Sequence, residues 1–110
     1  MDKMTALSAF AALSQPTRLD VFRLLIKAGD VGMSAGDISQ SLDVRQNTMS
    51  ANLSILNRAG LIRNAREGRS IRYYANMDGM RGLLAFLMED CCGGRPELCQ
   101  PVINELACAC

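Results

Sequence analysis

The spacing of apolar residues predicts two helices in the first quarter of the chain, over 6–13 and 16–28. In the second of them the apolar residues recur three and four positions apart: Leu19, Phe22, Leu25 and Ile26. A proline at its first position and Gly29 just after its last are the residues expected at the two ends of a helix.

Two further helices joined by a short break follow. The run Ser34-Ala35-Gly36-Asp37 resembles a capping box and predicts a short helix with Ile38 and Leu42 on one face. After a break at 43–45, a second helix is expected from about 46 to 59, ended by Gly60. Its buried stripe is expected to consist of Met49, Leu53 and Leu56.

The rest of the chain predicts a hairpin and a last helix. The stretch LIRNAREGRSIRYYA at 61–75 alternates around a Glu-Gly-Arg-Ser turn, which is typical of a β-hairpin. A final amphipathic helix is expected to end near Cys92, with an apolar face of Met80, Leu83, Leu84, Leu87 and Met88. The expected fold is mainly α with a small hairpin, a winged helix-turn-helix over 1–92, followed by a cysteine-containing tail over 93–110.

The charge of the chain is concentrated in its middle. The net charge is only +1, but residues 45–72 contain six arginines and one acid, so this segment carries +5 and the remainder carries −4. The asymmetry favours a polyanionic partner for the middle segment, although a solvated charged face would give the same count.

The elements follow one another in the order helix, break, helix and basic hairpin, and this order favours DNA as the polyanionic partner. A recognition helix buries one face and offers short polar side chains to base edges in the major groove. The residues expected there are Arg45, Gln46, Asn47, Ser50, Ala51, Asn52, Ser54 and Arg58. On the hairpin, Arg66, Arg69 and Arg72 are expected to follow phosphates or to enter a minor groove. The predicted partner is therefore double-stranded operator DNA.

Composition indicates a reduced, cytoplasmic setting. Five cysteines cannot all pair within one chain, and clustered cysteines in a reduced compartment usually bind metals or carry out thiol chemistry. The mildly apolar stretch 4–13 lacks the cleavage site of a signal peptide, and no run approaches the length of a membrane span.

Three thiols lie within nine residues, in the stretch DCCGGRPELC at 90–99. Cys91 and Cys92 are expected to continue the apolar face of the last helix, and the Gly-Gly turn after them would let Cys99 fold back. Burial at a helix end would explain the first two cysteines but not the third. We therefore expect Cys91, Cys92 and Cys99 to bind a soft metal or metalloid, with no direct role for Cys108 and Cys110.

Several motifs together resemble the arsenic-responsive repressors of the ArsR/SmtB family. FAALSQPTRLDVFRLL is similar to the family's second-helix signature, VRQNTMSANLSILNRAGLI to its recognition helix and REGRSIRYYA to its wing. The resemblance covers 10–87. It implies a homodimer formed by the first and last helices, which binds an imperfect inverted repeat and represses a resistance operon until a metal or metalloid arrives.

The sequence departs from the family at three places. The Cys-Val-Cys element of many arsenic sensors is absent, because residues 33–36 are Met-Ser-Ala-Gly, and without histidine the zinc and nickel site of the last helix cannot form. A histidine pair frequent in the recognition helix is replaced by Ala51-Asn52. Some arsenic sensors of the family do carry paired cysteines at the end of the last helix.

Thiolate-binding species remain as candidate inducers: arsenic, antimony, copper(I) and zinc. Zinc needs a fourth ligand, which would have to come from the tail. It must also displace the thiol protons, and the negative charges of Glu89 and Asp90 favour the protonated form of the cysteines. Arsenous acid instead condenses with three thiols without net proton release. As(III) is therefore the expected inducer, with Sb(III) second and no organic cofactor. Alternatives are a zinc- or redox-sensing repressor, a metalloid-handling protein or an oxidoreductase. No histidine or evident base accompanies the thiols, so we expect no enzyme.

Overall fold

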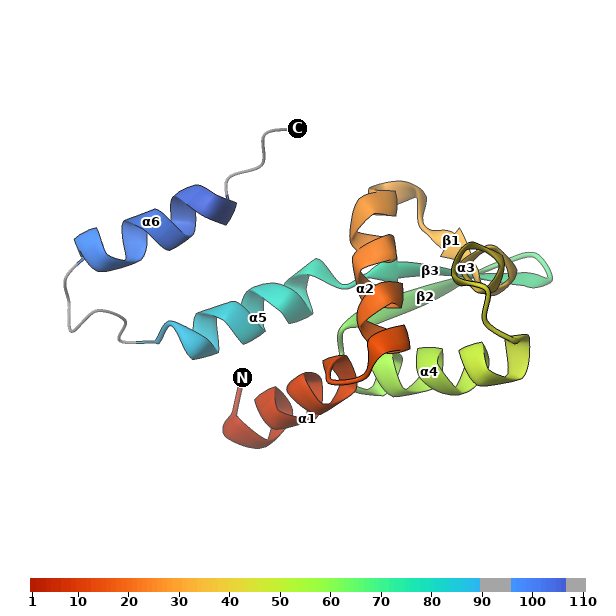
Figure 1. The fold of residues 1–110 in the computed structure, drawn as a ribbon, viewed down its shortest axis with the longest axis horizontal. Coiled ribbons are helices and arrows are strands. Elements are labelled where there is room, and N and C mark those ends of the chain that lie inside the picture. The colour runs from red at the N-terminus through yellow and green to blue at the C-terminus, as the bar shows by residue number, and fades with distance from the viewer. Residues whose placement is uncertain (90–95, 107–110) are drawn as a thin grey trace.

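The computed structural model describes residues 1–89 and 96–106. The elements in chain order are α1 (Lys3–Leu13), α2 (Pro16–Ala28), a 3-10 turn η1 (Gly29–Val31), β1 (Met33–Ser34), α3 (Ala35–Leu42), α4 (Gln46–Arg58), β2 (Ile62–Glu67), β3 (Ser70–Ala75), α5 (Met77–Leu87) and α6 (Pro96–Leu106). Figure 1 shows the winged helix-turn-helix arrangement, with α3 and α4 packed next to a small sheet. The expected fold class is confirmed.

Side-chain caps set the starts of three helices. The Asp2 carboxylate accepts a hydrogen bond of 2.7 Å from the backbone N–H of Thr5 at the start of α1, and this bond lowers the pKa of that carboxyl. Gln15 caps α2 through the N–H of Arg18 at 2.8 Å. Ser34 caps α3 as the capping pattern predicted, by accepting from Asp37 N–H at 3.1 Å.

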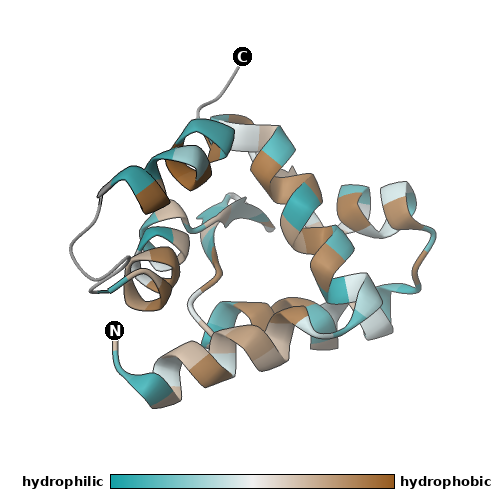
Figure 2. Ribbon diagram, turned by 60° about the vertical axis from the view of Figure 1, so that its left-hand side comes forward, coloured by the Kyte–Doolittle hydropathy of each residue, from teal (hydrophilic) through white to brown (hydrophobic). Residues whose placement is uncertain are grey.

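The core lies where α1, α2, α3 and α4 meet the base of the hairpin. It contains three alanines of α1, the predicted stripe of α4 and apolar residues from the other elements: Val21, Phe22, Leu25, Ile38, Leu61, Ile62 and Leu83. Figure 2 shows apolar and polar residues alternating around the helices, as burial of one face requires. None of the helices in the described part of the chain is long and apolar enough to cross a membrane.

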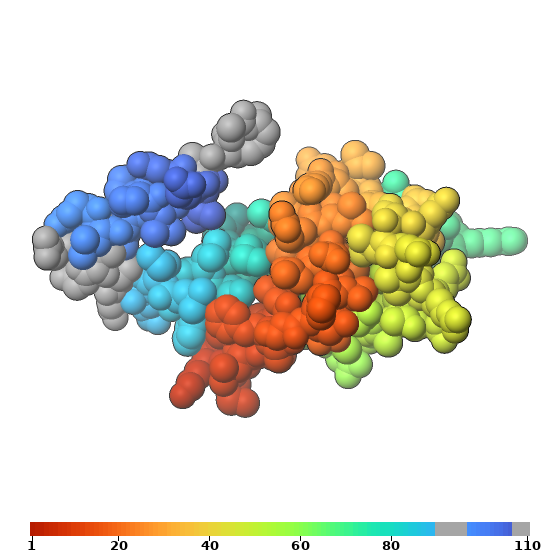
Figure 3. Space-filling view, in the orientation of Figure 1, coloured from red at the N-terminus to blue at the C-terminus, as the bar shows by residue number. Residues whose placement is uncertain are grey.

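The wing is a three-stranded antiparallel sheet in the order β1-β3-β2. The predicted hairpin is confirmed, with Ile62 opposite Ala75 at its base and Glu67 opposite Ser70 at its tip. Gly68 in the two-residue loop has φ +62°, a conformation that glycine adopts without strain. The tip projects from the body of the molecule in Figure 3. The strand β1 was not predicted, because two residues carry no periodic signal.

The C-terminal region differs from the sequence prediction in two ways. α5 ends at Leu87, and not near Cys92, because the bond from Glu89 N–H to the Phe86 carbonyl closes a tighter turn. The helix α6 was missed, since a Gly-Gly pair followed by Pro96 indicated a tail. Its signals were nevertheless present: proline at the first position, Glu97 in the first turn and apolar residues four apart, Leu98, Val102 and Leu106.

Candidate nucleic-acid interface

The recognition helix α4 presents one apolar and one polar face. Met49, Leu53 and Leu56 are buried, as predicted. Among the residues expected to contact DNA, most are exposed on α4 or just before it: Arg45, Gln46, Asn47, Ser50, Ala51, Ser54 and Arg58. The turn before α4 is held by the bond from Val44 N–H to the Ser39 carbonyl at 3.0 Å, with Asp43 in the left-handed region at φ +53°. This turn fixes the angle between α3 and α4.

Asn52 does not belong to the exposed face, and its expected place there is wrong. Its side chain is 7% exposed, and its Oδ1 accepts a hydrogen bond of 3.2 Å from Arg18 Nη1. Asn52 lies three residues after Met49 and four before Leu56, so it shares their buried face. Since Arg18 Nε also donates to the Ala12 carbonyl at 2.7 Å, this arginine links α1, α2 and α4.

Replacing Asn52 with alanine should therefore weaken folding. The loss of an acceptor for a charged, partly buried donor should lower the free energy of unfolding by about 1–2 kcal/mol, as measured by urea denaturation. Ser50→Ala, two residues away on the exposed face, is the control and should change it by less than about 0.5 kcal/mol. Equal stability of the two variants would contradict the structural role of Asn52.

The three wing arginines are not equivalent. Arg66 and Arg69 are exposed near the tip, whereas Arg72 is partly buried and its Nε donates to the Val31 carbonyl at 2.8 Å. Arg72 therefore also ties β3 to η1. No local pattern predicts this bond, since Val31 and Arg72 are 41 residues apart.

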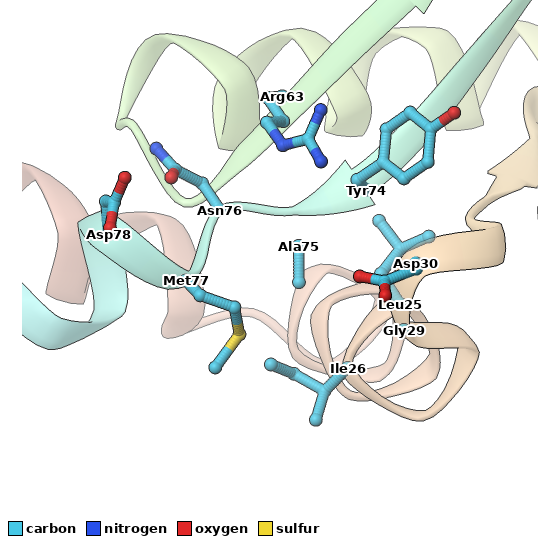
Figure 4. A pocket seen from close by; sticks show the side chains of 10 residues that line it. All are labelled: Leu25, Ile26, Gly29, Asp30, Arg63, Tyr74, Ala75, Asn76, Met77 and Asp78. Carbon is cyan, nitrogen blue, oxygen red and sulfur yellow. The ribbon is translucent and has the colours of Figure 1, made fainter.

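Arg63, the remaining arginine of the hairpin, lies over Tyr74 with its guanidinium carbon 4.4 Å from the ring centroid. The two residues are directly opposite each other in the β2–β3 register. Both line a hollow of about 280 Å³ at the base of the wing, shown in Figure 4, whose lining also includes Asp30 and Asp78. Arg63 is exposed, and its guanidinium group forms a cation–π contact with a ring of the same chain.

Of the three predicted ligand cysteines, only Cys99 lies within the described residues. Its side chain is 5% exposed on α6, and its sulfur forms a disulfide bond whose partner lies outside those residues. The sequence led us to expect reduced thiols, because it does not show that folding brings a second sulfur within bonding distance. Cys91 and Cys92 are outside the described residues. Within 1–89 and 96–106 no three acidic, Cys or His side chains are grouped to hold a metal ion.

The helix α4 follows a tight turn, buries one face and exposes polar residues on the other, and a basic hairpin lies beside it. This arrangement defines a winged helix-turn-helix DNA-binding protein. Comparisons with known proteins support this class. A family model of the helix-turn-helix domain matches residues 13–64. The transcriptional repressor SdpR of Bacillus subtilis is 36% identical over 84 residues, which cover 73% of this chain and 90% of SdpR.

Two solved structures place the chain more narrowly. An ArsR-like transcriptional regulator from Rhodococcus sp. RHA1 is similar with a TM-score of 0.71 and 26% identity, covering 97% of this chain and 96% of that one. The homodimeric winged helix-turn-helix domain of Mb0332 from Mycobacterium bovis, a possible ArsR-family regulator, has a TM-score of 0.64 and 25% identity, with 78% and 80% covered. The chain belongs to the ArsR-type family of DNA-binding transcriptional regulators.

Proposed function

We propose that this chain is a homodimeric repressor that leaves its operator when As(III) binds Cys91, Cys92 and Cys99. The observation that carries the proposal is the position of Cys99. It is buried on α6 and its sulfur is bonded to a second sulfur, so two of the thiols that such a site could use lie within bonding distance of each other. In Figure 1, α6 runs in the direction opposite to α5 after the segment that contains the other two cysteines.

Exposed apolar residues support the dimer. Met4 and Leu7 on α1 are 73% and 50% exposed, and Leu84 and Leu87 on α5 are 37% and 53% exposed. α1 and α5 contact each other, so these residues belong to neighbouring elements of one side of the molecule. Large apolar side chains gathered in this way mark an interaction surface. The similar domain of Mb0332 is homodimeric.

The chemistry of the proposed inducer suits three thiols. Arsenous acid exchanges its three hydroxyl groups for three Cys sulfurs, so that three As–S bonds form, three As–O bonds break and three waters leave with the thiol protons. No oxidant is needed, but the thiols must be reduced. A disulfide at Cys99 therefore excludes arsenite from the site.

Binding must favour the DNA-incompetent dimer in order to cause release. Joining Cys99 to cysteines that follow α5 would hold α6 against the helix proposed to form the dimer interface. The two recognition helices must reach major grooves about 34 Å apart, so a small change at that interface alters their fit. A coupling free energy of about 1–3 kcal/mol, typical of such switches, corresponds to roughly 5–150-fold weaker operator binding.

Arsenite titration into the preformed operator complex tests the proposal. Fluorescence anisotropy is followed on a duplex from the upstream region, with a phosphine reductant because dithiols bind arsenite. We expect anisotropy to fall at stoichiometric arsenite, with zinc having no effect. Tight DNA binding that arsenite leaves unchanged would overturn the inducer and keep the repressor.

Replacing Cys99 with serine should abolish the arsenite response, because two thiols remain where three As–S bonds are needed. Operator affinity without arsenite should stay within about threefold of the parent, since a buried Cys→Ser change far from α4 alters no DNA contact. The matched control carries serine at Cys108 and Cys110 and should respond as the parent does. A full response in Cys99→Ser would show that the three-thiol site is wrong.

The disulfide at Cys99 supports redox sensing as a second candidate function. Two thiols would lose two protons and two electrons to an oxidant, and the new S–S bond would join Cys99 to its partner. Diamide added to the operator complex in the absence of arsenite separates the two functions. Release by diamide that a phosphine reverses, together with no release by arsenite, would assign the cysteines to redox sensing.

A further inference from the structure

The C-terminal ends of α1 and α4 lie next to each other in Figure 1. Side chains of both helices line a hollow in the surface. The hollow has a volume of about 350 Å³, which is within the range of small-molecule sites. Its lining comes from α1, the first turn of α2, and α4 with the residue after it: Ser8, Ala11, Ala12, Arg18, Ile55, Arg58 and Ala59. It therefore touches the recognition helix, and no residue of β2 or β3 is part of its lining.

Among the described residues, the charged side chains of the lining are two guanidinium groups, those of Arg18 and Arg58. Arg18 is partly buried and held in place by its bonds to Ala12 and Asn52, which use two of its five N–H donors. Arg58 donates to Ser54 Oγ at 3.3 Å. In the part of the chain that the structure describes, neither arginine forms an ion pair with a carboxylate. Arg18 is therefore a partly buried cation without a carboxylate partner among these residues, and Arg58 is a second, exposed cation in the same lining. A partly buried cation normally has an anionic partner.

The remaining lining is mostly apolar. Ala11, Ala12 and Ile55 contribute methyl and methylene groups beside the arginines, and Ser8 contributes a hydroxyl group. We propose that this hollow binds a small organic acid, with its carboxylate on Arg18 and Arg58 and its apolar body against Ala11 and Ile55. A planar carboxylate matches the paired N–H donors of a guanidinium group.

Two other assignments fit less well. The hollow at the base of the wing contains acids as well as Arg63, so its charge does not select an anion. A phosphate of bound DNA has the same oxyanion chemistry as a carboxylate and could pair with Arg58. The apolar lining favours the organic acid, because a DNA phosphate would bring no apolar group to cover it.

Two-dimensional ¹⁵N NMR of the reduced protein without DNA tests the site, with benzoate as the probe. Benzamide is the uncharged analogue and inorganic phosphate the anion without an apolar body. We expect saturable shifts confined to residues around the hollow with benzoate, about tenfold weaker binding of phosphate and none of benzamide. No saturable benzoate binding, or equal affinity for phosphate, would overturn the proposal.

Ser8→Glu and Ser8→Gln form the matched pair of variants. The side chains are almost the same size, but the glutamate places a negative charge beside the two arginines. We expect Ser8→Glu to weaken benzoate binding about tenfold and Ser8→Gln to change it by less than about threefold. Equal weakening by both variants would show that shape and not charge governs the hollow, which contradicts the proposal.

The salt dependence of operator binding identifies the source of the oxyanion. If the organic acid is the ligand, the two Ser8 variants should share the slope of log affinity against log salt. If a DNA phosphate occupies the hollow, Ser8→Glu should lose a contact and its slope should be smaller in magnitude by about 0.9. That outcome would reject the organic acid and assign Arg58 to DNA.

Discussion

A protein in which Arg66 and Arg69 are both replaced by glutamine should bind operator DNA about tenfold to a hundredfold more weakly at low salt. Both side chains are exposed near the tip of the wing, which projects from the body of the molecule (Figure 3). Each charge removed from a phosphate contact should reduce the magnitude of the salt slope by about 0.9, so the double variant should lose about 1.8. Anisotropy titrations at four salt concentrations measure both quantities.

The control for charge replaces Arg23 and Arg81, which are exposed on α2 and α5, with glutamine. This double variant removes the same net charge, but at positions that lie outside the wing. It should leave the salt slope of operator binding nearly unchanged. If the two double variants behave alike, the wing makes no specific phosphate contacts and only overall charge matters. Weakening on operator DNA alone, with none on an unrelated duplex, would instead indicate base contacts in a minor groove.

Replacing Gly79 with alanine should lower the free energy of unfolding by about 2–3 kcal/mol. Gly79 lies in the first turn of α5, and a methyl group added there would overlap the carbonyl oxygen of Gly60, at the end of α4. That oxygen also accepts from Asn76 Nδ2 at 2.9 Å, and Asn76 N–H donates to the Leu61 carbonyl at 2.9 Å. The crowded atoms are backbone atoms fixed on both sides, so little can move to relieve the overlap.

Gly82→Ala is the control within the same helix. A methyl group there would meet only the flexible end of Met1 at 3.3 Å, and alanine favours the helix over glycine. Urea denaturation should show a change of less than about 1 kcal/mol, in the stabilising direction. Because the Gly60–Gly79 contact fixes the end of α4 against α5, Gly79→Ala should also weaken operator binding under conditions where it stays folded. Equal stability of both variants would contradict this packing.

The sequence predicted the helix-turn-helix well because its signals are local. A buried stripe at Met49, Leu53 and Leu56 needs only the period of a helix, and Ser34 can cap only a helix that begins next to it. The hairpin followed from alternation and the glycine at its tip. Where local signals conflicted, the prediction failed: α6 begins at a proline and continues through Pro101, which normally interrupts a helix.

The candidate site was predicted less completely than the fold. The helical period correctly predicted which polar residues of α4 are exposed: Gln46, Asn47, Ser50 and Ser54. Asn52 was assigned to the exposed face because it is polar, although its position in the helical period places it on the buried face. Its partner Arg18 is 34 residues away. A hydrogen bond between residues so far apart leaves no periodic pattern in the sequence. Any polar side chain that packing brings close could have formed it.

By itself, the sequence determined the identity and order of the helices and the hairpin from α1 to α5, the basic character of the middle segment and the three clustered thiols. Only the tertiary structure decided which polar residues hold the protein together and which remain on the surface. Asn52 and Arg72 are bonded to distant elements, Cys99 is bonded to another sulfur, and Arg18 and Arg58 share one hollow. The reason is that periodicity along the chain records burial of a face, whereas the partner of a buried polar group is chosen by packing between elements.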